Sequence, residues 1–308
     1  LQKITEEAIF AALNELYKRT KSPNLCMAGG VALNSVANGK IIANTPFKNI
    51  FIQPSAGDGG NSIGAAFYAY NTILNHPRTY TMEHAYLGPS YTTRDIKTFL
   101  DANNITYHEF TNDTALITAT AKLLAKKNVV GWFQQGMEFG PRALGARSIL
   151  ASPLTKDMQD ILNLKVKHRE AFRPFAPAVC DDDVHDYFDA DKPLPHAADF
   201  MLAVYPIKKN KQKLIPAVTH VDGTGRLQVV KQKNNPRYYR LIKSFGALTG
   251  IPILVNTSFN IRGEPIVCTP YHAYRCMMGT GIDYLVMDRF LIKRDDNPQD
   301  IWDSEHYA

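Results

Sequence analysis

The stretch LCMAGGVALNSVANGKII, Leu25 to Ile42, decides the fold class. A short apolar strand, LCMA, runs into the paired glycines Gly29 and Gly30, and the segment that follows has the composition of a helix. The pattern then repeats, because NIFIQ, Asn49 to Gln53, is a second strand and PSAGDGG leads into NSIGAAFYAYNTIL. We expect this last segment to be a small-residue helix packed closely on a sheet. Strands that alternate with glycine loops and helices indicate an α/β protein.

The same alternation resumes further along the chain. The segment HPRTYTMEHAYLGPSYTT, His76 to Thr93, contains proline and glycine but no clear period, so we interpret it as a linker. Beyond it the patterns predict helices and strands in turn, the helices at 113–127, 238–250 and 270–280 and the strands at 129–134, 251–257 and 283–292. We therefore divide the chain into a first unit, residues 1–85, and a second unit, residues 86–308.

Composition narrows the class of protein. The 308 residues are 45% hydrophobic, as in ordinary globular proteins, and no apolar run approaches the roughly 20 residues that cross a bilayer. Four scattered cysteines form no CxxC pair, which fits a reducing compartment, so we expect a cytoplasmic protein. The start, LQKITEEAIF, is no signal peptide and lacks an initiator Met, and we expect the sequence to be part of a longer protein.

Two basic motifs predict an anion site. GPRALGARSIL places Arg142 and Arg147 among glycines and a proline, and KVKHREAFRPFAP adds Lys167 and Arg173. Few acids accompany these cations, and guanidinium groups suit the bidentate recognition of phosphate or carboxylate. Structural salt bridging is the alternative. It explains less, because a surface ion pair gains nothing from so constrained a turn.

A row of short polar side chains ends a predicted strand in PILVNTSFNIRGEPIV. Asn256, Ser258 and Asn260 lie there, at the carboxyl end of the strand, which is the favoured ligand side of α/β sheets. A polar turn is the alternative, but it explains only part of the run. Because no GxSxG motif surrounds Ser258, we interpret its hydroxyl as a binding group rather than a nucleophile.

The two glycine loops of the first unit are candidates for a nucleotide or metal. In AGGVALN, paired glycines let a phosphate approach the backbone, although a tight turn with close packing is the more common reason for such a pair. In PSAGDGG, Asp58 follows a strand, where its carboxylate could face a ligand or a hard metal ion. A turn or helix-capping role is the alternative for Asp58.

The net charge of +6 is concentrated in one segment. Between Lys208 and Lys243 ten lysines and arginines accompany a single acid, Asp222. Such a run is usually a solvated face, but it could also attract nucleic acid. We therefore keep, as an alternative function, an RNA- or tRNA-binding module of a threonylcarbamoyl-type tRNA-modification protein.

Taken in order, six segments resemble the signature of a known family. GGVALNSVANGKI, PSAGDGGNSIGAA, GPRALGARSIL, KHREAFRPFAP, DGTGRLQVV and NTSFNIRGEPIV are similar to segments of the ATP-dependent O-carbamoyltransferases, which include the enzymes that carbamoylate nodulation factors, tobramycin and cephamycin. The resemblance implies the C-terminal part of an actin–hexokinase-like (ASKHA) domain over residues 1–85. It implies a YrdC-like α/β domain with a twisted mixed sheet over residues 86–308.

The resemblance also implies a reaction in two steps. The YrdC-like domain makes carbamoyl adenylate from carbamoyl phosphate and ATP. The first domain then transfers the carbamoyl group to a hydroxyl of a small-molecule acceptor, such as a sugar or another natural product, with the aid of a divalent metal of the Fe²⁺ or Mg²⁺ type in the full-length protein. We expect neither a membrane nor nucleic acid as a partner, and a homodimer stays open.

The family's site residues carry over by motif. The resemblance gives five binders of carbamoyl phosphate, of which the first three are catalytic: Arg142, Lys167, Arg173, Arg226 and Ser258. It gives a nucleotide loop, Gly29, Gly30 and Asn34, and a metal-binding aspartate, Asp58. The family's metal also needs two histidines of an HxxxH element, which this sequence lacks. We therefore expect Asp58 alone to bind metal poorly and complete transfer by this chain to fail.

Overall fold

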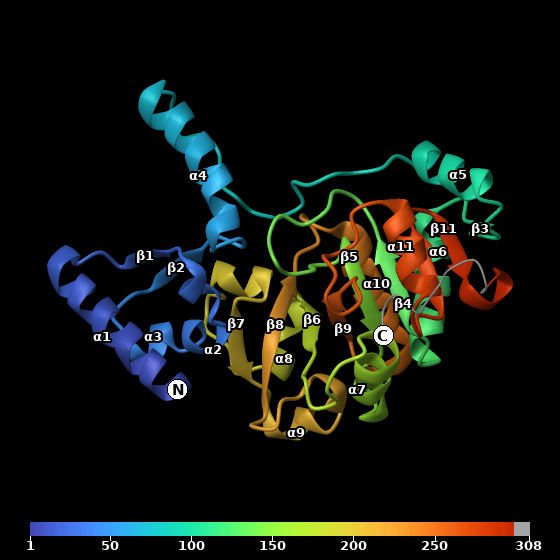
Figure 1. Ribbon diagram of the computed structural model, residues 1–308. Coiled ribbons are helices and arrows are strands. Elements are labelled where there is room, and N and C mark those ends of the chain that lie inside the picture. Colours follow the sequence, from blue (N-terminus) through green and yellow to red (C-terminus); the bar gives the residue numbers. More distant parts are fainter. Residues whose placement is uncertain (299–308) are drawn as a thin grey trace.

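The computed structural model describes residues 1–298, and within them the strands form two sheets (Figure 1). A nine-stranded mixed sheet has the order β3-β11-β10-β4-β5-β9-β6-β8-β7, and a separate parallel pair consists of β1 and β2. The strands are β1 (Asn24–Met27), β2 (Asn49–Ile52), β3 (His108–Glu109), β4 (Val130–Phe133), β5 (Arg147–Ala151), β6 (Ala176–Cys180), β7 (Ala203–Pro206), β8 (Thr224–Val230), β9 (Ile253–Ser258), β10 (Tyr284–Met287) and β11 (Phe290–Lys293). The expected α/β class with a mixed sheet is confirmed.

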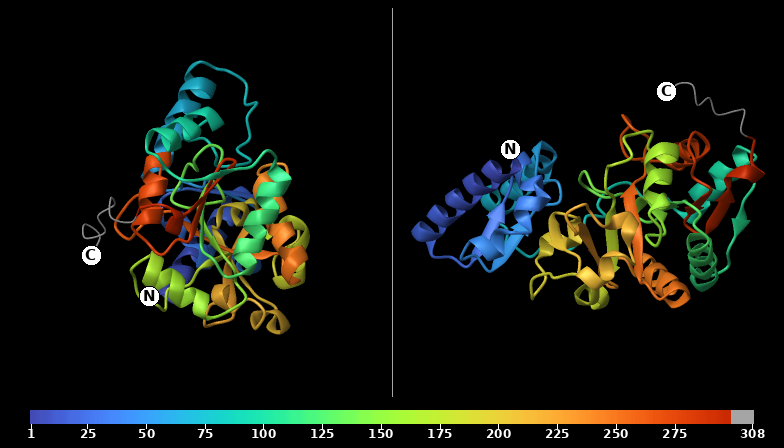
Figure 2. Two further views of the ribbon diagram at one scale, coloured as in Figure 1. Left: turned by 90° about the vertical axis from the view of Figure 1, so that its right-hand side faces the viewer. Right: turned by 90° about the horizontal axis from the view of Figure 1, so that it is seen from below.

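Helices accompany both sheets (Figure 2). No helix in residues 1–298 is long and apolar enough to span a bilayer. They are α1 (Gln2–Thr20), α2 (Ser35–Asn38), α3 (Ile41–Asn44), α4 (Asn61–Phe67), α5 (Thr93–Ala102), α6 (Asp113–Ala125), α7 (Asp157–Ile161), α8 (Val184–Tyr187), α9 (Lys209–Gln212), α10 (Pro236–Thr249) and α11 (Pro270–Met278).

The large sheet is covered on both faces. Along β4, Val130 and Trp132 pack in the cluster that contains the apolar side chains of α6 and α10. The neighbouring Phe133 belongs to a different cluster, shared with α7 and α11. Because successive side chains of a strand point to opposite faces, this alternation places helices on either side of the sheet. The central strands are consequently buried on both faces.

The first unit is joined to the β7 edge of the large sheet through α2 and the residue after it. The Asn38 amide donates to the carbonyl oxygens of Leu202, at 2.9 Å, and Ala32, at 2.8 Å. At Gly39 the two backbones approach so closely that a Cβ would lie 2.1 Å from the Val204 carbonyl oxygen. Only glycine fits there. The contact fixes α2 beside β7, where the pocket described below lies.

The helix predicted after Gly30 is broken into short turns. A 3₁₀ turn, Gly30–Leu33, precedes α2, and α3 begins only at Ile41. Asn34 stands at the break, where its side chain accepts the Ala37 N–H at 3.1 Å and caps α2. The apolar composition was read correctly as helical, but this cap and the docking of Gly39 interrupt the helix.

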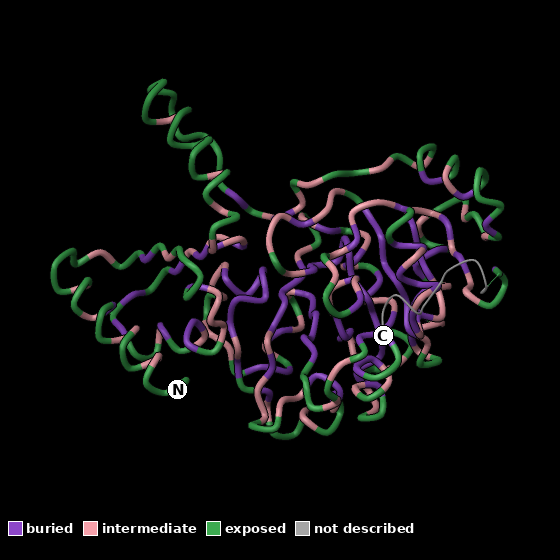
Figure 3. Tube along the Cα trace, viewed as in Figure 1, coloured by how far each residue is buried: buried purple, intermediate pink, exposed green. Residues whose placement is uncertain are grey.

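The helix predicted over Asn61–Leu74 is present, but its predicted packing is wrong. It continues from α4 as a π-helix, Tyr68–Ile73, and projects away from the sheets (Figures 1 and 3). Phe67, Tyr68 and Tyr70 are exposed along it. Small residues permit close packing but do not supply the surface to pack against, and residues 1–298 place no sheet beside this helix.

The single strand predicted over 283–292 is a hairpin. β10 and β11 pair antiparallel, with Met287 opposite Phe290, and Asp288 between them has a positive φ of 49°. An aspartate tolerates this left-handed conformation better than most residues. The apolar pattern on both sides of the turn hides it from a reading by hydrophobicity alone.

Candidate functional site

A pocket of about 430 Å³ lies between the first unit and the large sheet. Part of its wall comes from Ser35 and Val36 of α2, and the rest comes from the second unit. Four arginines line it, and its described lining residues include no aspartate or glutamate: Arg142, Arg169, Arg173 and Arg226. A concave site with several guanidinium groups and no carboxylate is suited to an anion.

A buried carboxylate shapes the loop that presents Arg142. Glu138 is 5% exposed, and its Oε1 accepts the backbone N–H groups of Leu144 (2.6 Å), Ala146 (2.8 Å) and Arg147 (3.2 Å). The loop thus closes around one oxygen atom. Its glycines and proline allow this tight path, as the sequence predicted, but Glu138 was missed because a lone Glu carries no sequence signal.

Two amides hold the same loop from the side of the sheet. Gln228 of β8 donates to the Leu144 carbonyl oxygen at 2.8 Å, and Asn256 of β9 donates to that of Ala143 at 3.1 Å. Within residues 1–298 the buried Nε of Arg142 has no hydrogen-bond partner, and burial lowers the pKa of Arg142. A held loop with an unpaired donor at the pocket favours a ligand that accepts hydrogen bonds.

Arg147, from the same motif, lies outside the pocket. It is fully buried, and its guanidinium donates to the carbonyl oxygens of Gln134 (2.6 Å), Gln135 (3.2 Å) and Pro89 (3.1 Å). Its Cζ lies 3.6 Å from the centre of the Phe133 ring. Arg147 therefore ties the loop after β4 to the segment before α5 and acts as a structural residue.

Arg226 lies on β8, opposite Val204 of β7. Burial lowers the pKa of Arg226 to about 9, and the positive charges of Arg142 and Arg169 add to the effect. No hydrogen bond or ion pair to its guanidinium occurs among residues 1–298. The effect of Arg142 and Arg169 on this pKa means that the three arginines lie close enough to repel one another. An anion between them would relieve that repulsion.

Arg169 and Arg173 come from the segment before β6 and are partly engaged elsewhere. Arg169 Nε donates to Asn163 Oδ1 at 2.7 Å, and its guanidinium stacks on the ring of Phe175. Arg173 pairs with Glu170 at 3.0 Å and keeps half of its side chain exposed. Of the two, Arg173 was predicted from its motif, whereas no role was predicted for Arg169 in the same motif. We expect both to bind an anion more weakly than Arg226.

Lys167 does not line the pocket but lies directly behind it. Its Nζ contacts the backbone oxygen and the Oγ of Ser258, and also the backbone oxygen and Oδ1 of Asn260, the last at 2.8 Å. Burial lowers the pKa of Lys167 to about 7. The oxygens around Nζ favour the ammonium form, so Lys167 holds the end of β9 and with it the Ser258 hydroxyl, which does line the pocket.

His220 lines the pocket, although no role was predicted for it. Its Nδ1 lies 3.0 Å from Thr224 Oγ1, and that hydroxyl donates to Asp222 Oδ1 at 2.6 Å. Because the hydroxyl proton is given to the carboxylate, Nδ1 must donate, which leaves Nε2 as the acceptor of the neutral ring. Burial lowers the pKa of His220, so the neutral form prevails at pH 7. Its position before the DGTGR motif was the available signal.

Two of the four nucleotide and metal candidates of the first unit line a separate pocket of about 500 Å³. Gly29 and Asp58 line it, whereas Gly30 and Asn34 do not. The Asn34 side chain is already used, in the cap of α2 and in two hydrogen bonds with Gln2. Residues 1–298 contain no group of three histidine, cysteine, aspartate or glutamate side chains able to hold a metal, and Asp58 alone does not fit one.

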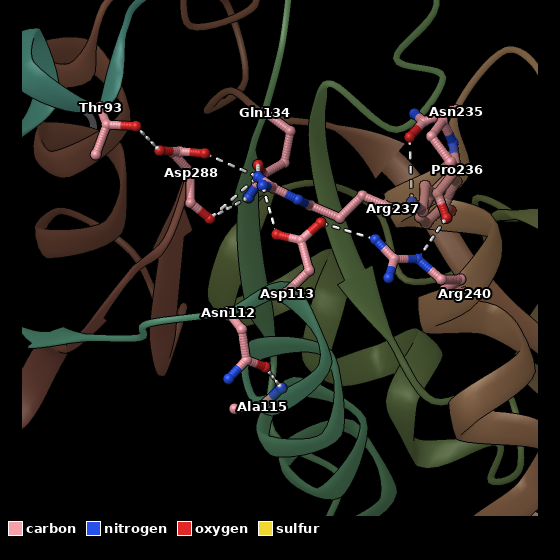
Figure 4. A network of polar contacts seen from close by, with 11 residues as sticks. Thr93, Asn112, Asp113, Ala115, Gln134, Asn235, Pro236, Arg237, Arg240 and Asp288 are labelled. Atoms are coloured by element: carbon pink, nitrogen blue, oxygen red, sulfur yellow. Dashed lines mark hydrogen bonds and ion pairs between the residues drawn. The ribbon is translucent and has the colours of Figure 1, made fainter.

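A further pocket of about 490 Å³ also contains arginines, but acids neutralise them (Figure 4). Arg237 pairs with Asp113 at 2.7 Å and Asp288 at 2.9 Å, and Arg240 pairs with Asp113 at 2.7 Å. Thr93 adds a hydrogen bond to Asp288. The guanidinium groups are thus already satisfied, which makes this pocket a poor anion site and leaves the pocket of Arg142 and Arg226 as the candidate.

Comparison with known proteins gives the family. Residues 121–294 match the family described as Carbamoyltransferase C-terminus, and residues 1–67 match Carbamoyltransferase N-terminus. The chain belongs to the carbamoyltransferase family. The family resemblance of the six motifs is thereby confirmed.

Relatives of this carbamoyltransferase chain include nodulation proteins. NolO of Bradyrhizobium diazoefficiens is 38% identical, over 96% of this chain and 54% of that protein. NolNO of Sinorhizobium fredii is 39% identical, over 97% of this chain and 44% of that protein. An uncharacterized protein of Synechocystis sp. is 45% identical, over 97% of this chain and 52% of its own length. The chain spans about half the length of these relatives.

Among solved structures, the chain is similar to full-length HypF in its phosphate- and nucleotide-bound form. The identity is 19% and the TM-score 0.41, over 61% of this chain and 23% of that one. A likeness at this level is too partial to support a functional argument. Inferences about the function of this carbamoyltransferase chain therefore come from its family membership and from the pocket of Arg142 and Arg226.

The basic run between Lys208 and Lys243 does not form one free cationic face. Acids on other elements pair with several members of the run: Lys231 with Asp199, Lys233 with Glu83, Arg237 and Arg240 with Asp113, and Lys243 with Asp183. Arg226 lines the pocket. Paired cations offer little to a phosphate backbone, so the structure of this carbamoyltransferase chain gives no support to the RNA-binding alternative.

Proposed function

We propose that the chain binds carbamoyl phosphate in the pocket of Arg142 and Arg226, as part of an ATP-dependent O-carbamoyltransferase. The observation that supports this is a pocket with four arginines and no carboxylate among its described lining residues. Because the chain belongs to the carbamoyltransferase family, we take the group that is transferred to be a carbamoyl group. The final acceptor is a hydroxyl of a small molecule, such as a sugar or another natural product.

The physical fit is between a compact dianion and rigid donors. Guanidinium groups on separate segments neutralise the phosphate without having to move, and the unpaired Nε of Arg142 gains a partner. As the phosphate departs, its negative charge develops next to these fixed cations, which is where electrostatic stabilisation is most effective. Arg173, more exposed and already paired with Glu170, adds charge at the rim.

ATP is the second substrate of the proposed reaction. Carbamoyl phosphate, ATP and one water give carbamoyl adenylate, pyrophosphate and phosphate, and the adenylate then donates its carbamoyl group to the acceptor. Gly29 and Asp58, at the pocket of the first unit, are the residues we propose to face nucleotide or metal in the full-length protein. Asp58 has no companion ligands in residues 1–298, so these residues do not form a metal site by themselves.

Isothermal calorimetry with fresh carbamoyl phosphate tests the assignment. Loss of a charged hydrogen bond is worth ~2–3 kcal/mol, so Arg142→Ala should weaken binding by roughly 30- to 150-fold. Arg173→Ala should cost about tenfold, because solvent and Glu170 already screen that side chain. Arg94→Ala, on the exposed side of α5, is the matched control and should bind as the wild type does. Wild-type affinity in Arg142→Ala would exclude this pocket as the site.

A further inference from the structure

The amide of Asn256 has one orientation that the surrounding carbonyl oxygens impose. The Leu144 carbonyl oxygen accepts from Gln228 Nε2 at 2.8 Å, so the Oε1 of Gln228 must face Asn256, at 2.6 Å. The Ala143 carbonyl oxygen also faces Asn256, at 3.1 Å. Both neighbours are acceptors. A flipped amide would bring oxygen against oxygen, so Nδ2 points toward Gln228 and Ala143.

This orientation leaves Asn256 Oδ1 as a buried acceptor without a partner. Asn256 is 1% exposed and lines the pocket, and within residues 1–298 its Oδ1 accepts no hydrogen bond. A buried unpaired acceptor costs free energy, and natural proteins rarely keep one without a reason. A ligand that occupies the pocket and donates a hydrogen bond would supply the missing partner.

The neighbouring polar groups restrict what that ligand can be. The arginines are donors only and select an anion, but the dianionic phosphate group of an acyl phosphate has no hydrogen to give to Oδ1. Ser258, the other polar side chain on this face of β9, already donates to Asn260 Oδ1 at 2.6 Å and contacts Lys167. The ligand must therefore combine an anionic group with an N–H or O–H donor a few bonds away.

We propose that Asn256 Oδ1 accepts a hydrogen bond from the amino group of the carbamoyl moiety and thereby selects carbamoyl phosphate over acyl phosphates that have a methyl group at that position. The inference rests on the proposed function and deepens it, because it assigns the arginines to the phosphate and Asn256 to the carbamoyl end. Gln228 is the positioning residue, since it fixes which atom of Asn256 faces the ligand.

Two stable phosphonates test the proposal by calorimetry with the 308-residue chain. Phosphonoacetamide carries the amino group, and 2-oxopropylphosphonate replaces it with a methyl group of similar size. The wild type should bind the first about tenfold tighter, as expected when one buried acceptor gains or loses its donor. Asn256→Leu should bring this ratio close to one while inorganic phosphate still binds, because the arginine side chains are untouched.

Control variants separate recognition from support of the loop. Gln228→Met removes a loop contact and one of the two acceptors that orient Asn256, but the Ala143 carbonyl oxygen still holds Nδ2, so the variant should retain part of the ratio even if both affinities fall. Equal binding of the two phosphonates by the wild type overturns the inference, and this result does not depend on the folding of any variant. If inorganic phosphate and both phosphonates fail to bind the wild type, the proposed function fails and takes the inference with it.

Discussion

Replacing Arg226 by methionine should stabilise the empty protein while it abolishes anion binding. Burial and two neighbouring arginines lower the pKa of Arg226 to about 9, which means that the folded chain carries this charge at a free-energy penalty. A lowering of this size corresponds to several kcal/mol. Because the side chain of Arg226 is only partly shielded from solvent, we expect removal of the charge to regain about 2 kcal/mol. Methionine is shorter than arginine, but its unbranched apolar chain replaces the buried stem of the side chain without the charge.

Urea unfolding and phosphate binding measure the two effects on one variant. Without ligand, Arg226→Met should unfold at a higher urea concentration than the wild type, with an unchanged slope. Phosphate should then raise the midpoint of the wild type, because a ligand that binds only the folded state stabilises it, and should leave that of Arg226→Met unchanged. Arg94→Met, an exposed arginine, controls for the substitution itself. A variant that is less stable than the wild type and still stabilised by phosphate would refute the reasoning.

Two further predictions concern cations that do not line the pocket. Arg147→Lys should lower the free energy of unfolding by about 2 kcal/mol, since lysine cannot reach the carbonyl oxygens of both Gln134 and Pro89. The folded fraction of this variant should still bind phosphate with the affinity of the wild type. A stable variant that has lost phosphate affinity would contradict the structural role of Arg147. The lowered pKa of Lys167, about 7, means that above pH 7 the folded chain binds fewer protons than the unfolded one, so stability should rise with pH between about 7 and 10. Urea titrations at pH 7 and pH 9 should show a rise that is smaller in Lys167→Met, and an equal rise in both proteins would argue against a buried, titrating lysine.

The sequence predicted the elements well where hydrophobic period and turn residues agreed. The helix over α6 and the strand over β4 lie close to where they were predicted. Errors arose where a tertiary contact decides the outcome: Gly39 is pressed against Val204, and the turn at Asp288 splits one apolar run into two strands. Local pattern contains no information about either contact. The boundary between the two units stays a prediction.

The candidate site was predictable in part. Residues from four separate motifs were expected to meet, and Arg142, Arg173, Arg226 and Ser258 do line one pocket. Lys167 was placed in the same set, but it supports the end of β9 from behind. Their roles as binders of carbamoyl phosphate stay a proposal that the calorimetry above tests.

By itself the sequence determined the α/β class, the family and the kinds of side chain that meet an anion, because these depend on residue type and order along the chain. The tertiary structure alone decided which cations are free. Arg142 and Arg147 stand five positions apart in one motif, yet backbone carbonyl oxygens occupy the terminal nitrogens of Arg147 away from the pocket, while Arg142 lines the pocket. Arg237 and Arg226 belong to one basic run, but acids neutralise only the former. The reason is that a cation is available to a ligand only if no acid or carbonyl oxygen of the protein already pairs with it. Those partners come from segments distant in the sequence.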